Sequence, residues 1–179
     1  VGAVVIPLRR LERRRVDRFR RPGPALDPGE QLRIGRGQPV PDLLDRIDVP
    51  DENVHAMATT GDVSDLEAAA QAYAADLARF GTEEHPWPEF YLCFLGVGPD
   101  GHIASLFPYR PEIQVTDRSV VPVWHSPKPP ENRLTLTRPV INSARCVWLV
   151  LSGVDKASPL GLALAGASYE TVPAAGAKG

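Results

Sequence analysis

An apolar run followed at once by a glycine-rich segment constrains this chain more than any other feature. Residues 89–95 read EFYLCFL, and residues 96–108 read GVGPDGHIASLFP. A short, nearly continuous apolar run is typical of a strand that is buried on both faces. Because ligands of an open α/β sheet bind beyond the carboxyl ends of its strands, the sequence predicts that the glycine-rich segment carries the chemistry.

Helical and strand patterns alternate along the rest of the chain. Ser64 and Glu67 stand three residues apart before an apolar period from Leu66 to Phe80, which predicts a capping box and an amphipathic helix that ends before Gly81. Other predicted elements are strands at residues 119–124, 133–137 and 146–151, a helix at 155–165, a short helix after 41 and a short strand ending near 57. Helices interleaved with buried strands predict an α/β fold with a layered sheet.

Charge is unevenly distributed along the 179 residues. Residues 1–40 hold ten of the 20 basic residues, all of them arginines, and only four acidic residues, so this segment is +6 within a chain of net charge −2. Proline and glycine interrupt it, and beyond an apolar start at residues 1–8 no period buries a face. We expect an atypical segment at 1–40 and a domain at 41–179. With one aromatic and no lysine, the segment does not favour a nucleic-acid partner.

Several other classes are disfavoured by composition. No window approaches the roughly 18 to 20 apolar residues of a membrane-spanning helix, and the start lacks the zones of a secretion signal, so we expect a cytoplasmic protein without a membrane partner. Cys93 and Cys146 both lie in apolar runs, which predicts buried thiols rather than a disulfide or a metal site. The sequence gives no reason to infer a metal.

Three glycines of the loop fit a dinucleotide fingerprint only in spacing. Gly96, Gly98 and Gly101 satisfy G-x-G-x-x-G, but Pro108 follows seven residues after Gly101 and leaves little room for the helix that would hold a pyrophosphate. Asp100 and His102 point to a different chemistry. An imidazole takes a proton from water near neutral pH, and a nearby carboxylate fixes its tautomer. The alternative, in which Asp100 caps the turn and His102 bonds a backbone carbonyl, stays open.

The loop GVGPDGHIASLFP resembles the signature of the 6-phosphogluconolactonases. Three further segments agree in order: SPKPPENRLTLT at 126–137, WLVLSGVDKA at 148–157 and VPAAG at 172–176. The resemblance covers about residues 42–179. Sugar-phosphate isomerases and deaminases of the glucosamine-6-phosphate type share GxGxDGH, but the SLFP ending is similar to the lactonase branch.

The resemblance implies a Rossmann-like fold and hydrolysis of 6-phospho-D-glucono-1,5-lactone to 6-phosphogluconate in the pentose phosphate pathway, without a metal or organic cofactor. By resemblance, His102 is the general base for water and Asp100 orients the loop or the imidazole. Gly96, Gly98 and Gly101 are expected to bind substrate, with backbone N–H groups around Gly98 and Gly101 as candidate oxyanion contacts.

The phosphate of such a substrate needs cations. Only three of the 20 basic residues are lysines, and two of these, Lys128 and Lys156, fall inside the matching segments, as does Arg133. We expect these three side chains to address the phosphate or the sugar hydroxyls, although a solvated surface charge remains the alternative for each.

Departures from the family pattern lie before residue 42. The resemblance implies a first strand with a phosphate-cradling Ser/Gly/Thr-rich turn and a segment like W-x-D-E-R, and neither is present. We therefore expect an N-terminally incomplete domain, with residues 1–40 out of frame or of unrelated origin. Three interpretations compete: a lactonase, an amino-sugar phosphate isomerase or deaminase, and an inactive fragment or basic-arm binding module. The oligomeric state stays open.

Overall fold

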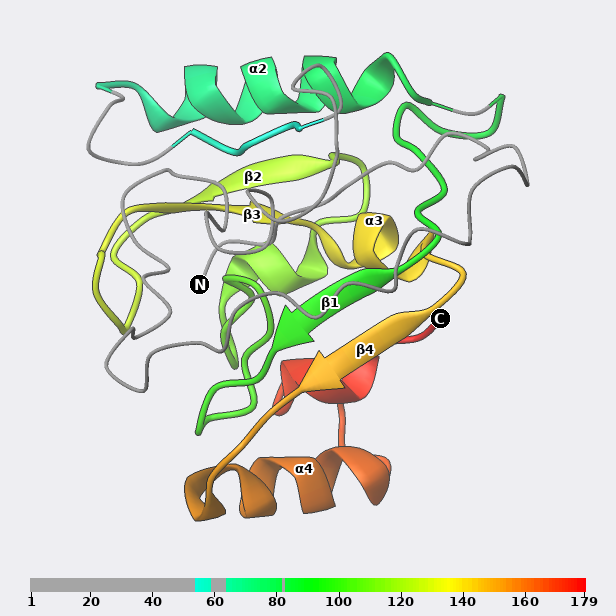
Figure 1. Cartoon of the computed structure of the whole chain (residues 1–179). Helices are drawn as coiled ribbons and strands as arrows, with labels where there is room; N and C mark the ends of the chain where they lie inside the picture. Colours follow the sequence, from blue (N-terminus) through cyan, green and yellow to red (C-terminus); the bar gives the residue numbers. More distant parts are fainter. Residues whose placement is uncertain (1–53, 59–63, 82) are drawn as a thin grey trace, which may run out of the picture.

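The computed structural model describes residues 54–58, 64–81 and 83–179. The predicted segment 1–40, its apolar start and the short helix after residue 41 lie outside the described residues. Figure 1 labels the elements, which are α2 (Leu66–Ala78), β1 (Cys93–Gly96), η2 (Pro111–Gln114), β2 (Val120–Val123), β3 (Arg133–Leu136), α3 (Arg138–Asn142), β4 (Val147–Val150), η3 (Val154–Lys156), α4 (Ala157–Leu164) and η4 (Pro173–Gly176). The predicted α/β class is confirmed, as are the strands at 119–124, 133–137 and 146–151 in shortened form.

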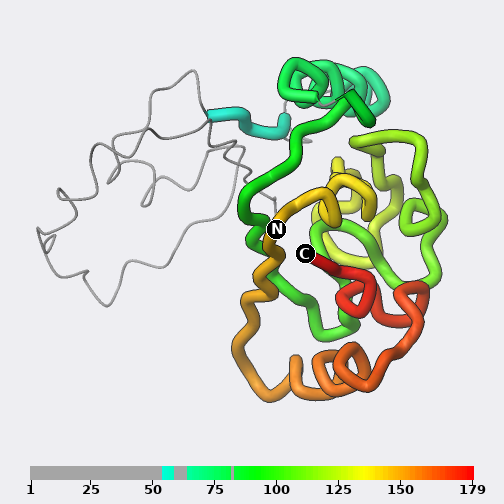
Figure 2. The backbone as a smooth tube through the Cα atoms, turned by 90° about the vertical axis from the view of Figure 1, so that its right-hand side faces the viewer, coloured from blue at the N-terminus to red at the C-terminus, as the bar shows by residue number. Residues whose placement is uncertain are grey.

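The four described strands form two pairs. β1 lies parallel to β4, with Cys93 opposite Val147, and β2 lies antiparallel to β3, with Val123 opposite Arg133. Helix α2 packs on β2 and β3, whereas α4 packs on η3 and η4. Figure 2 shows α2 and α4 at opposite ends of the described part, with the strands between them. The parallel pair therefore brings the chain following β1 and the chain following β4 to the same end.

Helix α2 has the predicted amphipathic face but a different N-cap. Asp65, not Ser64, caps it: its carboxylate accepts hydrogen bonds from the N–H groups of Glu67 at 2.9 Å and Ala68 at 3.1 Å. Two adjacent residues of the sequence are able to cap this helix, and the carboxylate of Asp65 satisfies two N–H groups at once. The helix ends at Ala78, before Gly81 as predicted.

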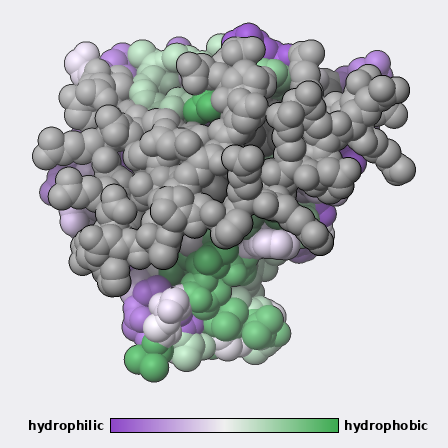
Figure 3. All heavy atoms as spheres, viewed as in Figure 1, coloured by the Kyte–Doolittle hydropathy of each residue, from purple (hydrophilic) through white to green (hydrophobic). Residues whose placement is uncertain are grey.

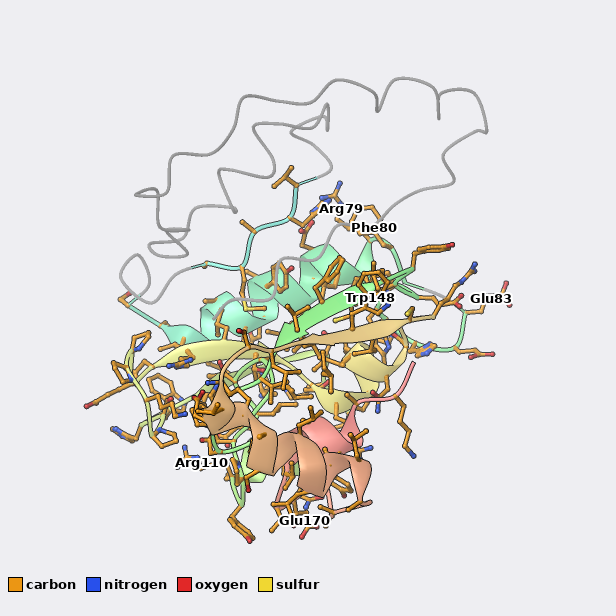
Figure 4. The ribbon with its side chains drawn as sticks, turned by 60° about the horizontal axis from the view of Figure 1, so that its bottom comes forward. Arg79, Phe80, Glu83, Arg110, Trp148 and Glu170 are labelled. Carbon is orange, nitrogen blue, oxygen red and sulfur yellow. The ribbon has the colours of Figure 1, made fainter. Side chains whose placement is uncertain are left out.

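The expectation that the first apolar run is a strand buried on both faces is wrong. In β1 the side chains of Cys93 and Leu95 are buried, but Phe94 is 52% exposed and meets Trp148 of β4 edge to face, with 5.4 Å between ring centroids. Figure 4 shows Trp148 on the side of the pair away from α4, and Figure 3 shows apolar side chains at the surface where Figure 1 places β4 and α4. The β1–β4 pair therefore buries one face only.

The two cysteines differ in environment. Both are free thiols. Burial raises the pKa of Cys93 to about 11, so this thiol stays protonated and inert. Cys146 is only partly buried, which corrects the expectation that both thiols lie in the core.

Two short elements also differ from the prediction. Residues 54–58 contain no strand, only a single bridge residue at His55. Helix α3 was not predicted, although Thr137 followed by a proline in the first turn is a usual helix start. The helix expected at 155–165 is present as η3 followed by α4. None of the described helices is long and apolar enough to cross a membrane.

Candidate active site

The glycine-rich segment after β1 folds back on itself as a tight loop. The N–H of Gly98 donates to the carbonyl of His102 at 2.9 Å, and the N–H of Gly101 donates to the carbonyl of Gly98 at 2.9 Å. Buried apolar side chains of the same segment anchor it in the core: Val97, Ile103, Leu106 and Phe107. A loop held by its own backbone and by the core positions its polar side chains rigidly.

Both inner glycines are required by the space around them. A Cβ on Gly98 would overlap the imidazole of His102 and lie 2.7 Å from Oδ1 of Asp100. Gly101 has φ of +80°, a left-handed conformation that favours glycine, and a Cβ there would lie 2.8 Å from Cγ1 of Val172. Because both N–H groups already have acceptors within the loop, the geometry does not support the oxyanion contacts expected of them. Gly96 is exposed at the end of β1.

His102 and Asp100 form a close pair in this loop. Nδ1 of the imidazole lies 2.5 Å from Oδ1 of Asp100, and the same oxygen receives the backbone N–H of His102 at 3.4 Å. The carboxylate thus contacts both the turn and the ring. A neutral imidazole bonded in this way carries its proton on Nδ1, which leaves the lone pair of Nε2 as an acceptor. Among the described residues, none is hydrogen-bonded to Nε2.

The loop segment 126–130 brings a cation to the same carboxylate. Nζ of Lys128 lies 3.2 Å from Oδ1 of Asp100. Ser126 fixes the backbone of this lysine from one side, because its Oγ donates to the Lys128 carbonyl at 2.8 Å and accepts the Lys128 N–H at 3.3 Å. Lys128, Asp100 and His102 therefore meet at one oxygen atom.

The pKa values of the pair suit a neutral base beside an ionised carboxylate. Burial lowers the pKa of His102; the bond and charge of Asp100 offset this in part, and the charges of Lys128 and Arg133 lower it further. Burial alone would raise the pKa of Asp100, but hydrogen bonds and charge from His102 and a hydrogen bond from Lys128 outweigh it, so this pKa is lowered. Near pH 7 the imidazole is neutral and the carboxylate is charged.

Arg133, at the start of β3, does not present a free cation to the site. Its side chain is buried, and its guanidinium donates to three consecutive backbone carbonyls: Nε to Pro130 at 2.9 Å, and Nη2 to Pro129 at 2.6 Å and Lys128 at 2.9 Å. This geometry favours a role in shaping segment 128–130 over the predicted contact with substrate.

Lys156 lies in η3, which follows β4 at the end of the β1–β4 pair where the glycine-rich loop follows β1. Its ammonium pairs with the carboxylate of Asp155. The pKa of Asp155 is lowered, first by that hydrogen bond and, among the smaller causes, by the charge of Lys128. The charges of Lys128 and Lys156 therefore both act on the carboxylate of Asp155.

Two contributing residues were missed by the sequence reasoning. Ser126 is the first residue of the segment SPKPP, so its position two residues before Lys128 could have indicated its bonds to that lysine. Thr135 is a buried polar residue of β3 whose Oγ1 accepts the N–H of Ser105 at 3.1 Å, which ties the loop to the second strand pair. No three His, Cys, Asp or Glu side chains within the described ranges are grouped so as to hold a metal ion.

Comparisons with known proteins give one consistent result. The family model described as glucosamine-6-phosphate isomerases/6-phosphogluconolactonase matches residues 37–179. The chain is 48% identical over 141 residues to the 6-phosphogluconolactonase of Streptomyces coelicolor, covering 76% of this chain and 54% of the relative, and 48% identical over 139 residues to that of Mycobacterium tuberculosis, covering 76% and 56%.

Solved structures agree with the sequence relatives. The crystal structure of 6-phosphogluconolactonase from Thermotoga maritima superposes with a TM-score of 0.63 at 28% identity, covering 78% of this chain and 58% of that one. The chain spans about half the length of the curated relatives it matches. Because the family model matches most of the chain and the relatives agree with it, the chain belongs to the glucosamine-6-phosphate isomerase/6-phosphogluconolactonase family.

Proposed function

We propose that this chain hydrolyses 6-phospho-D-glucono-1,5-lactone to 6-phosphogluconate, a step of the pentose phosphate pathway. The observation that carries the proposal is the His102–Asp100 pair, with Lys128 on the same carboxylate oxygen, in a chain 48% identical to proteins named 6-phosphogluconolactonase. A sugar-phosphate lactone as the small-molecule partner and a cytoplasmic location belong to the same proposal.

The reaction starts with attack of water on the lactone carbonyl. Nε2 of His102 accepts a proton from water while the water oxygen bonds to the carbonyl carbon, and the carbonyl electron pair moves onto its oxygen. The imidazolium that forms is stabilised by the carboxylate of Asp100 at 2.5 Å. Because this carboxylate fixes the tautomer, the accepting lone pair is always on Nε2.

Collapse of the tetrahedral intermediate completes the hydrolysis. The oxyanion electron pair reforms the carbonyl, the bond from this carbon to the ring oxygen breaks, and the ring oxygen takes the proton from Nε2. The histidine returns to its neutral form, and the new carboxylic acid ionises in solution. A lactone is an activated ester, so no covalent nucleophile is needed, and correct positioning of water and substrate supplies much of the rate.

We assign binding of the substrate phosphate to two lysines, Lys128 and Lys156. Lys128 is partly exposed, and its ammonium has three donors, of which one bonds to Asp100. Lys156 adds a second cation, paired with an exposed aspartate. Lys128, which contacts the loop after β1, and Lys156, which follows β4, favour an anionic substrate over a neutral one.

The test is the rate of acid release from 6-phospho-D-glucono-1,5-lactone in a pH-stat, compared with spontaneous hydrolysis. Accelerated release that is saturable in lactone supports the proposal. Ammonia release from glucosamine 6-phosphate without lactone hydrolysis would instead select the isomerase and deaminase branch of the family. A chain that folds and accelerates neither reaction would contradict both enzymatic functions.

The acid limb of kcat/KM is expected below the ordinary histidine pKa of about 6.5. Only the neutral imidazole accepts a proton, so activity falls as pH drops through the lowered pKa of His102. Lys128→Met removes a charge that lowers this pKa, and the limb of the variant is therefore expected at higher pH than that of the wild type. Lys178→Met, which removes an exposed lysine at the C-terminus, is the matched control and leaves the limb in place. If the acid limb of Lys128→Met stayed at the wild-type pH, the assignment of this limb to a His102 imidazole influenced by Lys128 would be contradicted.

A further inference from the structure

We propose that Arg133 is a positioning residue: its guanidinium fixes the backbone of residues 128–130 and thereby holds the ammonium of Lys128 on the carboxylate of Asp100. The inference deepens the proposed function and rests on it for its kinetic consequence. It reassigns an arginine that its sequence context associated with substrate binding.

The guanidinium is committed to backbone acceptors. Arg133 is 8% exposed, and its Nε and Nη2 donate to the carbonyls of Lys128, Pro129 and Pro130 at 2.6–2.9 Å. These three carbonyls are bonded by two separate donor nitrogens, which the rigid planar guanidinium of arginine supplies, whereas lysine has one nitrogen from which all its donors must reach. Backbone pairing with Val123 holds the arginine itself in β3.

The fixed backbone belongs to the residue that completes the site. One acceptor of Arg133 is the carbonyl of Lys128, which also receives Oγ–H of Ser126 at 2.8 Å. With its backbone held from two sides, Lys128 needs to order only its own side chain to reach Oδ1 of Asp100 at 3.2 Å. Because fewer rotatable bonds have to be ordered, the Lys128–Asp100 contact costs less conformational entropy.

Arg133 and the candidate base share a contact with the ring of Phe107. Its guanidinium carbon is 5.6 Å from the ring centroid of Phe107, and that ring packs on the imidazole of His102 at 4.5 Å between centroids. The arginine thus contacts the same phenyl ring as the imidazole, while Lys128 reaches the Asp100 carboxylate that contacts the imidazole. The charge of Arg133 also lowers the pKa of His102 directly, but lysine at position 133 keeps that charge, so the effect of Arg133→Lys on the reaction is expected to pass through Lys128.

A double-mutant cycle tests this coupling with Arg133→Lys, Lys128→Met and the combined variant. Lysine at 133 keeps the charge but not the fork. Arg133→Lys is expected to lower kcat/KM for the lactone about 10- to 100-fold when Lys128 is present, as for a small misplacement of a site group, and less than about twofold in the Lys128→Met background. Equal losses in both backgrounds, or a raised KM in both, would overturn the proposal in favour of a general structural role or direct substrate contact.

An NMR titration of the His102 imidazole supplies a readout without turnover. The charge of Lys128 lowers the pKa of His102, so Lys128→Met is expected to raise the titration midpoint. Arg133→Lys is expected to raise it as well, and the combined variant to show no further rise. If the wild-type chain does not hydrolyse the lactone, the proposed function fails while this readout still decides the positioning. If the titration midpoint of His102 is unchanged in Arg133→Lys, the positioning role of Arg133 is overturned.

Arg138→Lys is the matched control. Arg138 is a partly buried arginine at the start of α3 that lies over the ring of Tyr169 at 4.3 Å, away from segment 128–130. Neither kinetics nor the His102 titration is expected to change in this variant. Thermal unfolding checks that every variant is folded. If Arg133→Lys does not fold, the proposal is overturned, because the arginine then supports the fold as a whole.

Discussion

Replacing His102 with asparagine is expected to lower kcat/KM for 6-phospho-D-glucono-1,5-lactone by about 100- to 10,000-fold, the usual range for loss of a general base. Asparagine keeps a polar side chain of smaller size but has no nitrogen able to take a proton from water near neutral pH. Initial rates of acid release, corrected for spontaneous hydrolysis, measure the effect. The loss should persist at every pH between 6 and 9, because no protonation state of the variant restores a base.

His85→Asn provides a control with the same chemical change. His85 lies two residues from Glu83, and Figure 4 shows Glu83 at the opposite end of the molecule from Arg110, which follows the glycine-rich loop. Removal of this imidazole is expected to leave kcat/KM within about twofold, as for substitutions far from a site. If His102→Asn retained more than a tenth of wild-type activity, with its fold confirmed by thermal unfolding, another group would have to be the base.

The pairing of His102 with Asp100 is the part of the site that local sequence predicts best. A glycine between the two residues permits the left-handed turn that brings the carboxylate to the ring, and strand β1 before the loop places the pair at a sheet end. Lys128 was identified only through its segment, since 28 residues separate it from the carboxylate it contacts. Local patterns predict short-range geometry, and such long-range contacts need the tertiary fold.

The direction of the Arg133 side chain was not predictable from sequence. A charged residue at a strand start is normally solvated, and only the backbone of residues 128–130, folded beneath it, supplies the acceptors that bury it. The exposed face of β1 is a similar case. The apolar run that includes Phe94 suits burial on both faces, but whether a second layer covers a strand depends on other elements.

Replacing Gly98 with alanine is expected to abolish activity as completely as loss of the histidine, by a steric route. A Cβ at this position would overlap the His102 imidazole and approach Oδ1 of Asp100 to 2.7 Å, so the ring must leave its place against the carboxylate. The backbone of Gly98 cannot retreat freely, because its N–H and carbonyl bond within the loop to His102 and Gly101. Overpacking of this kind typically costs about 1–3 kcal/mol of unfolding free energy.

Gly161→Ala separates this steric effect from the general effect of adding a methyl group. Gly161 lies in α4, and a Cβ there meets nothing within 4 Å. Alanine in a helix interior is favoured over glycine by roughly 0.5–1 kcal/mol, so this control is expected to raise the free energy of unfolding and to leave kcat/KM unchanged. Denaturant unfolding and lactone kinetics on both variants provide the comparison. An active Gly98→Ala chain would mean that the imidazole works from a position other than the one bonded to Asp100, and the assignment of Nε2 as the proton acceptor would then be lost.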